Sequence, residues 1–469
     1  MRLSAKPNDI GRCARGAGWV LSTLLSLGGL AAPAGAQTPP AADQAPAEAP
    51  KSIWERDTLT GDWGGLRTEL ANQGITFSLT ETDEVLGNVS GGLRQGAIVE
   101  GVTKMGVGFD LEKLLGWKGG SVTVNAYQIH GRGLSANYVG NLMAASNIEA
   151  PSGSRLNDLF LEQSLFDDKL NLRIGQFAAD EEFLVSDVAG TFINSTFGWP
   201  GIYGVDLPNG PAYPFSAPAV RIRYSPTDKA SIQAAVFSGN PLGNDGNPGG
   251  IHFPVYGVFA IVEASYSTMP GKDDPSLGGN YKIGGWYNSL RFDDLHMDST
   301  GQSLASSSSN GTPASHKGDY GLYALMDHQI YRVPGTDDGG LSGFARIAAA
   351  PQQDRNAVYF YLDAGATWKG TFPGRDNDVV GLAVAWANVS HSLRSLDLDA
   401  NFDSGVDSPI QSSEVVLELT YQAPITPWLT LQPDFQYVFH PGGGLPQAND
   451  PTQALNDAAI FGLRGTITF

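Results

Sequence analysis

The chain has almost no cysteine, little charge and few basic residues. Its single cysteine, Cys13, excludes a disulfide scaffold and a cysteine-based metal cluster. Charged residues make up 16% of the 469 positions, against roughly 25% in an ordinary soluble domain. Lys and Arg number 29 against 48 Asp and Glu, and the resulting charge of −19 argues against nucleic-acid binding. The 59 glycines show no collagen-like period, and 10% aromatic residues are too many for a disordered chain.

Motifs for catalysis are also missing. The seven histidines are scattered, with no two of them three or four residues apart, and neither a G-x-S-x-G elbow nor a P-loop is present after residue 36. Asp180, Glu181 and Glu182 form an acidic run, which we interpret as the start of a loop in preference to a carboxylate pair or a Ca²⁺ site. The sequence therefore predicts a protein that is not an enzyme and needs no cofactor or metal. A barrel hydrolase that uses loop carboxylates and a histidine stays as an alternative.

Residues 1–36 have the pattern of a secretory signal peptide. Arg2, Lys6, Arg12 and Arg15 precede an apolar stretch over 16–30, and small residues at 34–36 predict cleavage before Gln37. An uncleaved anchor helix is the alternative, but this stretch is shorter than the roughly 20 residues that span a bilayer. Cleavage removes four basic residues and only one acid, so the exported chain is still more acidic.

The remaining chain divides into three parts. Residues 37–50 are rich in Ala and Pro and are expected to form a linker. Residues 51–74 are expected to contain a short helix, with Asp62 as its cap, Leu66 and Leu70 on one face and Gly74 as its end. Residues 75–469 contain no run of 18 apolar residues, which leaves a soluble exported protein or a transmembrane β-barrel.

Strict alternation of apolar and polar residues dominates 75–469. Val415, Leu417 and Leu419, for example, alternate with Glu414 and Glu418, as in a sheet with one apolar face. We predict strands at 75–86, 97–110, 121–131, 156–166, 169–177, 219–225, 229–237, 255–266, 280–290, 319–332, 341–350, 357–369, 378–388, 411–422, 428–440 and 458–469. A soluble β-sandwich or propeller also alternates, but the strand length, the strand number and the missing blade repeat disfavour it. The pattern predicts an all-β fold, a transmembrane antiparallel β-barrel of about 16 strands.

The connections alternate in length. Three connections are tight turns, at 167–168, 226–228 and 425–427. Four others are long and either polar or glycine-rich, at 178–218, 291–318, 389–410 and 441–457. Short turns on one side and long loops on the other are typical of outer-membrane barrels. Aromatic residues near the strand ends, such as Trp117 and Trp428, fit the interfacial girdles of such barrels.

The connection at 178–218 is too apolar for a free external loop. It contains Phe183, Phe192, Phe197 and Trp199, which are best buried against the barrel wall. We therefore predict a constriction loop that folds into the lumen.

Polar side chains on the inward face are the candidate solute contacts. A sugar needs hydrogen-bond donors, acceptors and an aromatic face for its C–H groups. Arginine is favourable in a wet lumen and costly against lipid. The predicted substrate-binding residues are the donors Arg173, Arg221 and Arg223, the acceptors Glu84 and Glu162, and the aromatic Trp199. The alternative is that these residues only hydrate a pore.

Several stretches resemble the OprB-type carbohydrate-selective porins of Gram-negative outer membranes. They are 59–67 (LTGDWGGLR) with Gly74 and Ile75, 87–92 (GNVSGG), 173–176 (RIGQ), 432–437 (QPDFQY) and 440–443 (HPGG). The resemblance implies a sixteen-stranded outer-membrane barrel that passes monosaccharides, most often glucose, through a lumen of arginines and carboxylates. The partners expected are small sugars, outer-membrane lipid and lipopolysaccharide, with either a monomer or a homotrimer as the assembly. A non-selective diffusion porin and a soluble exported sugar-binding protein stay as alternatives.

Overall fold

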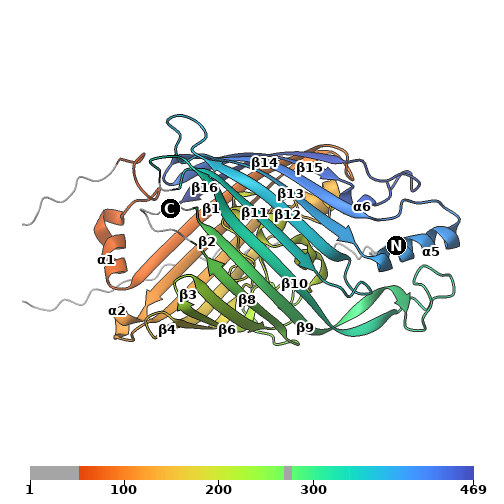
Figure 1. The fold of residues 1–469 in the computed structure, drawn as a ribbon, viewed down its shortest axis with the longest axis horizontal. Coiled ribbons are helices and arrows are strands. Elements are labelled where there is room, and N and C mark those ends of the chain that lie inside the picture. The colour runs from red at the N-terminus through yellow and green to blue at the C-terminus, as the bar shows by residue number, and fades with distance from the viewer. Residues whose placement is uncertain (1–51, 269–276, 337) are drawn as a thin grey trace, which may run out of the picture. The chain divides into compact units, whose positions relative to one another are not determined.

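The computed structural model of the protein describes residues 52–268, 277–336 and 338–469 (Figure 1). The predicted signal peptide at 1–36 and the linker at 37–50 lie outside these residues. Among the described helices, none has the length and apolarity needed to cross a membrane.

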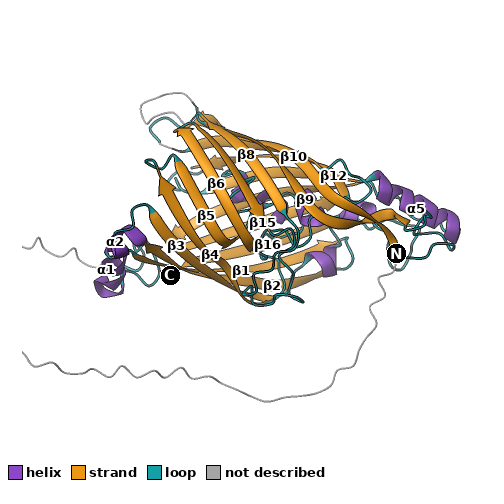
Figure 2. Ribbon diagram, turned by 90° about the horizontal axis from the view of Figure 1, so that it is seen from below, coloured by secondary structure: helices purple, strands orange, loops and turns teal. Residues whose placement is uncertain are grey.

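Sixteen antiparallel strands close into one barrel. Each strand pairs with its neighbours in sequence, and β1 closes the barrel against β16 (Figure 2). The strands are β1 (Ile75–Ser90), β2 (Gly96–Asp110), β3 (Gly120–Gly131), β4 (Gly153–Leu165), β5 (Leu170–Phe177), β6 (Ala217–Thr227), β7 (Ala230–Phe237), β8 (Phe259–Ser267), β9 (Gly279–Asp298), β10 (Pro313–Arg332), β11 (Gly340–Ala349), β12 (Val358–Lys369), β13 (Val379–Val389), β14 (Ser413–Thr426), β15 (Leu429–Phe439) and β16 (Ala458–Thr468). The predicted fold class and strand count are confirmed.

The two faces of the sheet differ as the alternation predicted. On β1, Val85 is 52% exposed on the outside, whereas its neighbours Glu84 and Leu86 are buried on the inside. On β13, Leu382 faces outward and Ala383 inward. The outward apolar side chains form the lipid-facing surface, and the polar set lies in the lumen.

The predicted helix within 51–74 is present and lies at the short-turn end of the barrel. A 3₁₀ turn (Trp63–Gly65) leads into α1 (Leu66–Asn72), and Gly74 follows with a φ of +99°. The Asp62 carboxylate accepts from the backbone N–H of Thr68 at 2.8 Å. The ring of Trp63 packs 5.8 Å from that of outward-facing Phe77, so this segment sits beside β1 and outside the lumen.

Two long connections expected as loops contain regular structure instead. β9 and β10 continue beyond the predicted ends at 290 and 319 as a long hairpin, which leaves only 299–312 as a loop. Residues 389–410 contain α5 (His391–Ser404), which Ser390 caps and Gly405 ends in a left-handed conformation. Both features lie at the end of the barrel opposite α1 and the short α2 (Leu111–Leu115), as Figure 1 shows.

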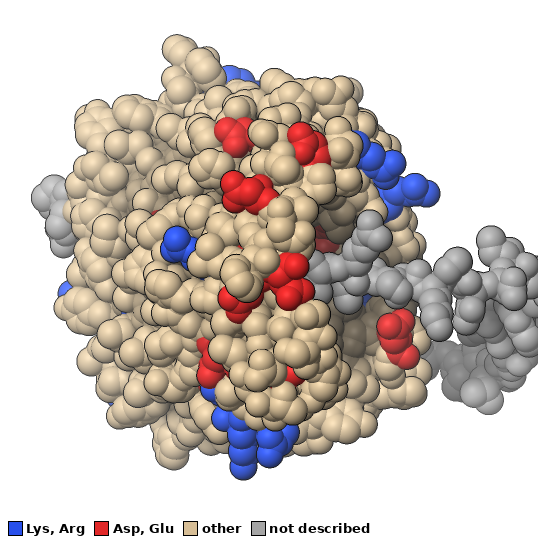
Figure 3. Space-filling view, turned by 90° about the vertical axis from the view of Figure 1, so that its right-hand side faces the viewer, with Lys and Arg blue, Asp and Glu red and all other residues tan. Residues whose placement is uncertain are grey.

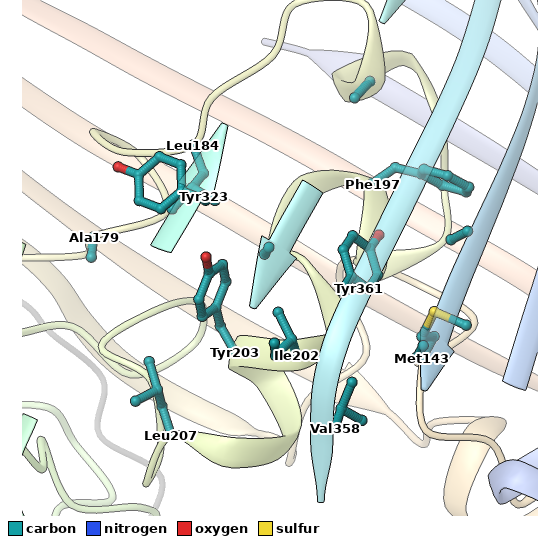
Figure 4. Packing of buried hydrophobic residues seen from close by; sticks show 14 of the residues in the cluster. Met143, Ala179, Leu184, Phe197, Ile202, Tyr203, Leu207, Tyr323, Val358 and Tyr361 are labelled. Atoms are coloured by element: carbon teal, nitrogen blue, oxygen red, sulfur yellow. The ribbon is translucent and has the colours of Figure 1, made fainter. Parts of the chain in front are cut away.

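The connection between β5 and β6 folds into the lumen, as predicted. It contains α3 (Ser195–Gly198) and α4 (Gly201–Asp206), and its Phe183, Phe192 and Tyr203 are fully buried. Figure 4 shows Tyr203 of this loop beside Tyr323 of the wall. A second inward loop, residues 132–152 between β3 and β4, was not predicted; its apolar Leu134, Val139 and Met143 are also buried.

Candidate functional site

Buried carboxylates of the barrel wall hold both inward loops through their backbone. Glu418 of β14 accepts from the N–H groups of Ile193 and Asn194 at 2.6 and 2.9 Å. Glu414 accepts from Leu142 and Met143 of the other loop at 2.7 and 2.8 Å. Both glutamates are fully buried. A carboxylate that accepts two N–H groups satisfies donors that the loop would otherwise bury unpaired.

Further wall contacts fix the β5–β6 loop to β8 and β11. Glu263 of β8 accepts from the N–H of Leu184 at 2.9 Å. Arg346 of β11, ion-paired with Asp363, donates to the carbonyl of Thr196 at 2.9 Å. The loop is thereby attached to wall strands from β8 to β14, and its first turn faces β4–β6.

At that first turn, three arginines and two glutamates form a compact cluster. Arg173 of β5 and Arg221 of β6 stand opposite each other in the register, and Glu162 of β4 stands opposite Arg173. Glu182 of the loop receives Arg173 Nη1 at 2.6 Å, Arg221 Nε at 2.9 Å and Arg223 Nη2 at 3.0 Å. Glu162 receives Arg173 at 2.7 Å and Arg221 at 3.1 Å. The cluster carries three positive and two negative charges.

The members of this arginine cluster differ in exposure. The exposed side chains can contact a solute, whereas the buried ones can only hold their neighbours in position. The Arg221 side chain is 1% exposed and that of Glu182 is 6%, whereas Arg223 is 39% exposed. Arg223 and Glu182 line a polar hollow of about 790 Å³ at the short-turn end of the barrel, together with Glu181, Gln233, Glu263 and Lys282 among others. The cluster therefore forms one wall of an open, polar hollow.

A second polar group lies beside the same loop turn. Lys104 of β2 lies 5.4 Å from the ring of Tyr127 and 5.9 Å from that of Tyr213. The Tyr127 hydroxyl donates to Glu181 at 3.3 Å. Burial, and then the neighbouring Glu181, raise the pKa of Asp180 to about 7. Donors, acceptors and aromatic faces thus meet here as well.

The structure brings together four of the six predicted site residues: Glu162, Arg173, Arg221 and Arg223. Glu84 lies on β1, four strands from β5, where it is ion-paired with Arg464. Trp199 is half-buried with its ring 5.0 Å from that of Tyr203, in the aromatic packing of the loop.

Glu182, the residue on which the arginines converge, was missed as a site residue. It was interpreted only as part of an acidic loop start. One feature of the sequence could have identified Glu182. It is an acidic residue at the beginning of the apolar loop, and that loop is followed directly by the inward-facing Arg221 and Arg223.

Figure 3 looks onto the end of the barrel that carries α5 and α6 (Pro441–Gly444). Acidic side chains occur across this face, in keeping with the net charge of −19. Figure 3 also shows several Lys and Arg side chains toward the margin of the same face.

Comparison with known proteins identifies a family and several relatives that this chain resembles. The family described as "Carbohydrate-selective porin, OprB family" matches residues 94–469. Porin B of Pseudomonas aeruginosa is 29% identical over 429 residues, covering 86% of this chain and 90% of Porin B. A putative porin of Acinetobacter baylyi, QuiX, is 22% identical over 456 residues, covering 89% of this chain and 94% of that protein.

Among solved structures, the high-pH structure of Pseudomonas putida OprB superimposes with a TM-score of 0.80 at 27% identity, covering 89% of this chain and all of that one. The relatives indicate a channel, in agreement with the closed barrel and its polar lumen. The chain belongs to the OprB family of carbohydrate-selective porins and is a sugar-selective porin of the Gram-negative outer membrane.

Proposed function

We propose that this porin passes glucose-like monosaccharides and that the arginine cluster selects them. The observation that supports this is the convergence of Arg173, Arg221 and Arg223 on Glu182 beside an open polar hollow. Guanidinium groups donate to sugar hydroxyls through a fixed fork, and carboxylates accept from them.

The roles follow from exposure. Arg223, Arg173 and Glu162 keep 39%, 15% and 25% of their side chains exposed, so they contact the solute. Arg221 is a positioning residue, because its side chain is only 1% exposed and its donors are taken by Glu182, Glu162 and Asn171. This differs from the expectation that Arg221 donates to hydroxyls itself.

Trp199 and Glu84 act elsewhere along the path. The half-buried indole of Trp199 offers an aromatic face on the loop, and Glu84 orients Arg464, which also donates to Asn147 at 2.6 Å. A solute then meets several weak sites in succession, which favours entry without slowing release.

Swelling of proteoliposomes that contain the folded protein tests this proposal. Glucose should enter faster than its size alone predicts when it is compared with a disaccharide and with neutral amino acids. Arg223→Ala should reduce that advantage, whereas Arg394→Ala on the exposed surface of α5 makes the same charge change away from the constriction. Entry rates that follow size alone in the unmodified protein would favour a non-selective diffusion porin.

A further inference from the structure

The outward face of β1–β3 carries a group of polar side chains within an apolar band. Asp83 of β1 is opposite Gly101 of β2, which is opposite His130 of β3. One step toward the short turns, Glu81 is opposite Thr103, which is opposite Gln128. Exposed apolar residues flank the group along the strands: Leu79 and Met105 on one side, Val85 and Val99 on the other.

Three potential metal ligands converge over Gly101. His130 Nε2 is 2.9 Å from Asp83 Oδ1 and 3.7 Å from Glu81 Oε1, and the three ligand atoms lie within 4.8 Å of one another. A Cβ at position 101 would lie 2.4 Å from both Asp83 Oδ1 and His130 Nε2. The missing side chain of Gly101 is therefore what leaves space for the ligands to meet.

Neighbouring side chains orient the ligands. Gln128 Nε2 donates to the carbonyl of Ile129 at 3.4 Å, so Gln128 Oε1 faces His130 Nδ1 at 3.1 Å. The imidazole then donates from Nδ1 and turns the lone pair of Nε2 toward the two carboxylates. Thr103 Oγ1 donates to Glu81 Oε2 at 2.5 Å and leaves Oε1 free to point at the same space. A second hydrogen bond that fixes each ligand is typical of metal sites.

The charge of the group requires a cation. A neutral imidazole and two carboxylates sum to −2, and among the ion pairs of the described residues no Lys or Arg side chain pairs with Glu81 or Asp83. Uncompensated charge on the lipid face of a barrel is costly. A divalent ion brings the group to neutrality.

We propose that Glu81, Asp83 and His130 bind a divalent transition metal, with Zn²⁺ as the probe. Tetrahedral Zn²⁺ with bonds of about 2.0–2.1 Å places its ligands about 3.4 Å apart, which lies between the two distances at His130. Water completes the coordination. The ion reaches the site from the rim of the sheet, because β3 ends one residue after His130.

A second trio supplies a matched control. Asp294, His316 and Asp354 also lie within 4.8 Å of one another, and Asp294 and His316 are near the ends of β9 and β10 that the loop 299–312 joins. Arg355, however, donates to both oxygens of Asp354 at 2.7 and 3.0 Å. This trio already has its cation, so it should bind Zn²⁺ more weakly.

The test is calorimetric titration of Zn²⁺ into the folded, chelator-treated protein in detergent. We expect one tight Zn²⁺ per chain and a higher unfolding temperature on saturation. His130→Gln and Asp83→Asn should each weaken binding at least tenfold, whereas His316→Gln should leave it unchanged. Heat-modifiable migration on gels checks that each variant is folded.

Three outcomes overturn the proposal. They are no Zn²⁺ binding by the unmodified protein, equal binding after both His130→Gln and Asp83→Asn, and binding that is lost only in His316→Gln. The result is independent of sugar selectivity, which the swelling assay measures separately.

Discussion

Glu182→Gln should loosen the constriction by detaching the first turn of the β5–β6 loop. The Glu182 carboxylate accepts from three arginines of the wall at 2.6–3.0 Å with 6% of its side chain exposed. A glutamine keeps one acceptor oxygen and loses the negative charge. Hydrogen bonds to charged groups contribute about 1.5–3 kcal/mol each, and breaking a buried ion pair costs about 3–5 kcal/mol.

We expect a net loss of about 3 kcal/mol for this turn, because the amide oxygen retains one arginine. Such a loss shifts the equilibrium between attached and detached turn roughly 100-fold toward detachment. The rest of the loop stays in place, since Glu263 and Glu418 hold it farther along. We therefore expect a wider passage in a barrel that is still folded.

Glu162→Gln is the matched control. It makes the same change of charge in the same cluster, but Glu162 belongs to the wall strand β4 and holds no part of the loop. Both variants should raise the preference for anions in single-channel recordings. Only Glu182→Gln should raise disaccharide entry relative to glucose in the swelling assay. Equal disaccharide entry in the two variants would refute the assignment of Glu182 as the attachment of the loop.

Three further predictions concern the anchors and the pH response. Glu418→Gln replaces one of the two oxygens that accept from the N–H groups of Ile193 and Asn194 with a donor, so cleavage of the loop by added protease should become faster while the barrel resists; unchanged cleavage would contradict the anchoring role. Arg346→Met leaves Asp363 buried without its cation and should cost about 3–5 kcal/mol in urea unfolding, against less than about 1 kcal/mol for exposed Arg394→Met. The raised pKa of Asp180, about 7, means that the folded state keeps a proton that the unfolded chain loses near its ordinary pKa of 3.8, so stability falls as pH rises between these values. Asp180→Asn should therefore raise the unfolding temperature at about pH 8 and leave it nearly unchanged below about pH 4; an equal shift at both would contradict this origin.

The acidic composition of the chain has a structural use beyond surface charge. Glu414 and Glu418 are fully buried and accept from loop backbone, not from lysine or arginine. A loop inside a barrel presents N–H groups that no strand pairs, and a carboxylate can accept two of them at once. Some of the acidic residues that exceed the basic ones therefore hold the loops in the lumen.

The strands and their two faces could be predicted from the sequence alone. A period of two is a local property, so Leu382 outside and Ala383 inside follow from the neighbouring residues without any tertiary contact. The inward direction of Arg173, Arg221 and Arg223 follows from the same rule. The apolar content of residues 178–218 likewise predicted burial of that loop, because so many exposed aromatics would be unfavourable in water.

Tertiary structure alone decided what these side chains contact. Glu418 reaches Ile193 across 225 residues, and no local pattern encodes such a pair. The convergence on Glu182 depends on the path of the loop, and the meeting of Glu81, Asp83 and His130 depends on the register of three strands and on Gly101. Helix α5 has no buried residue, so no apolar face marked it in the sequence. Alternation specifies the face of a residue, whereas strand register and loop path determine its partners.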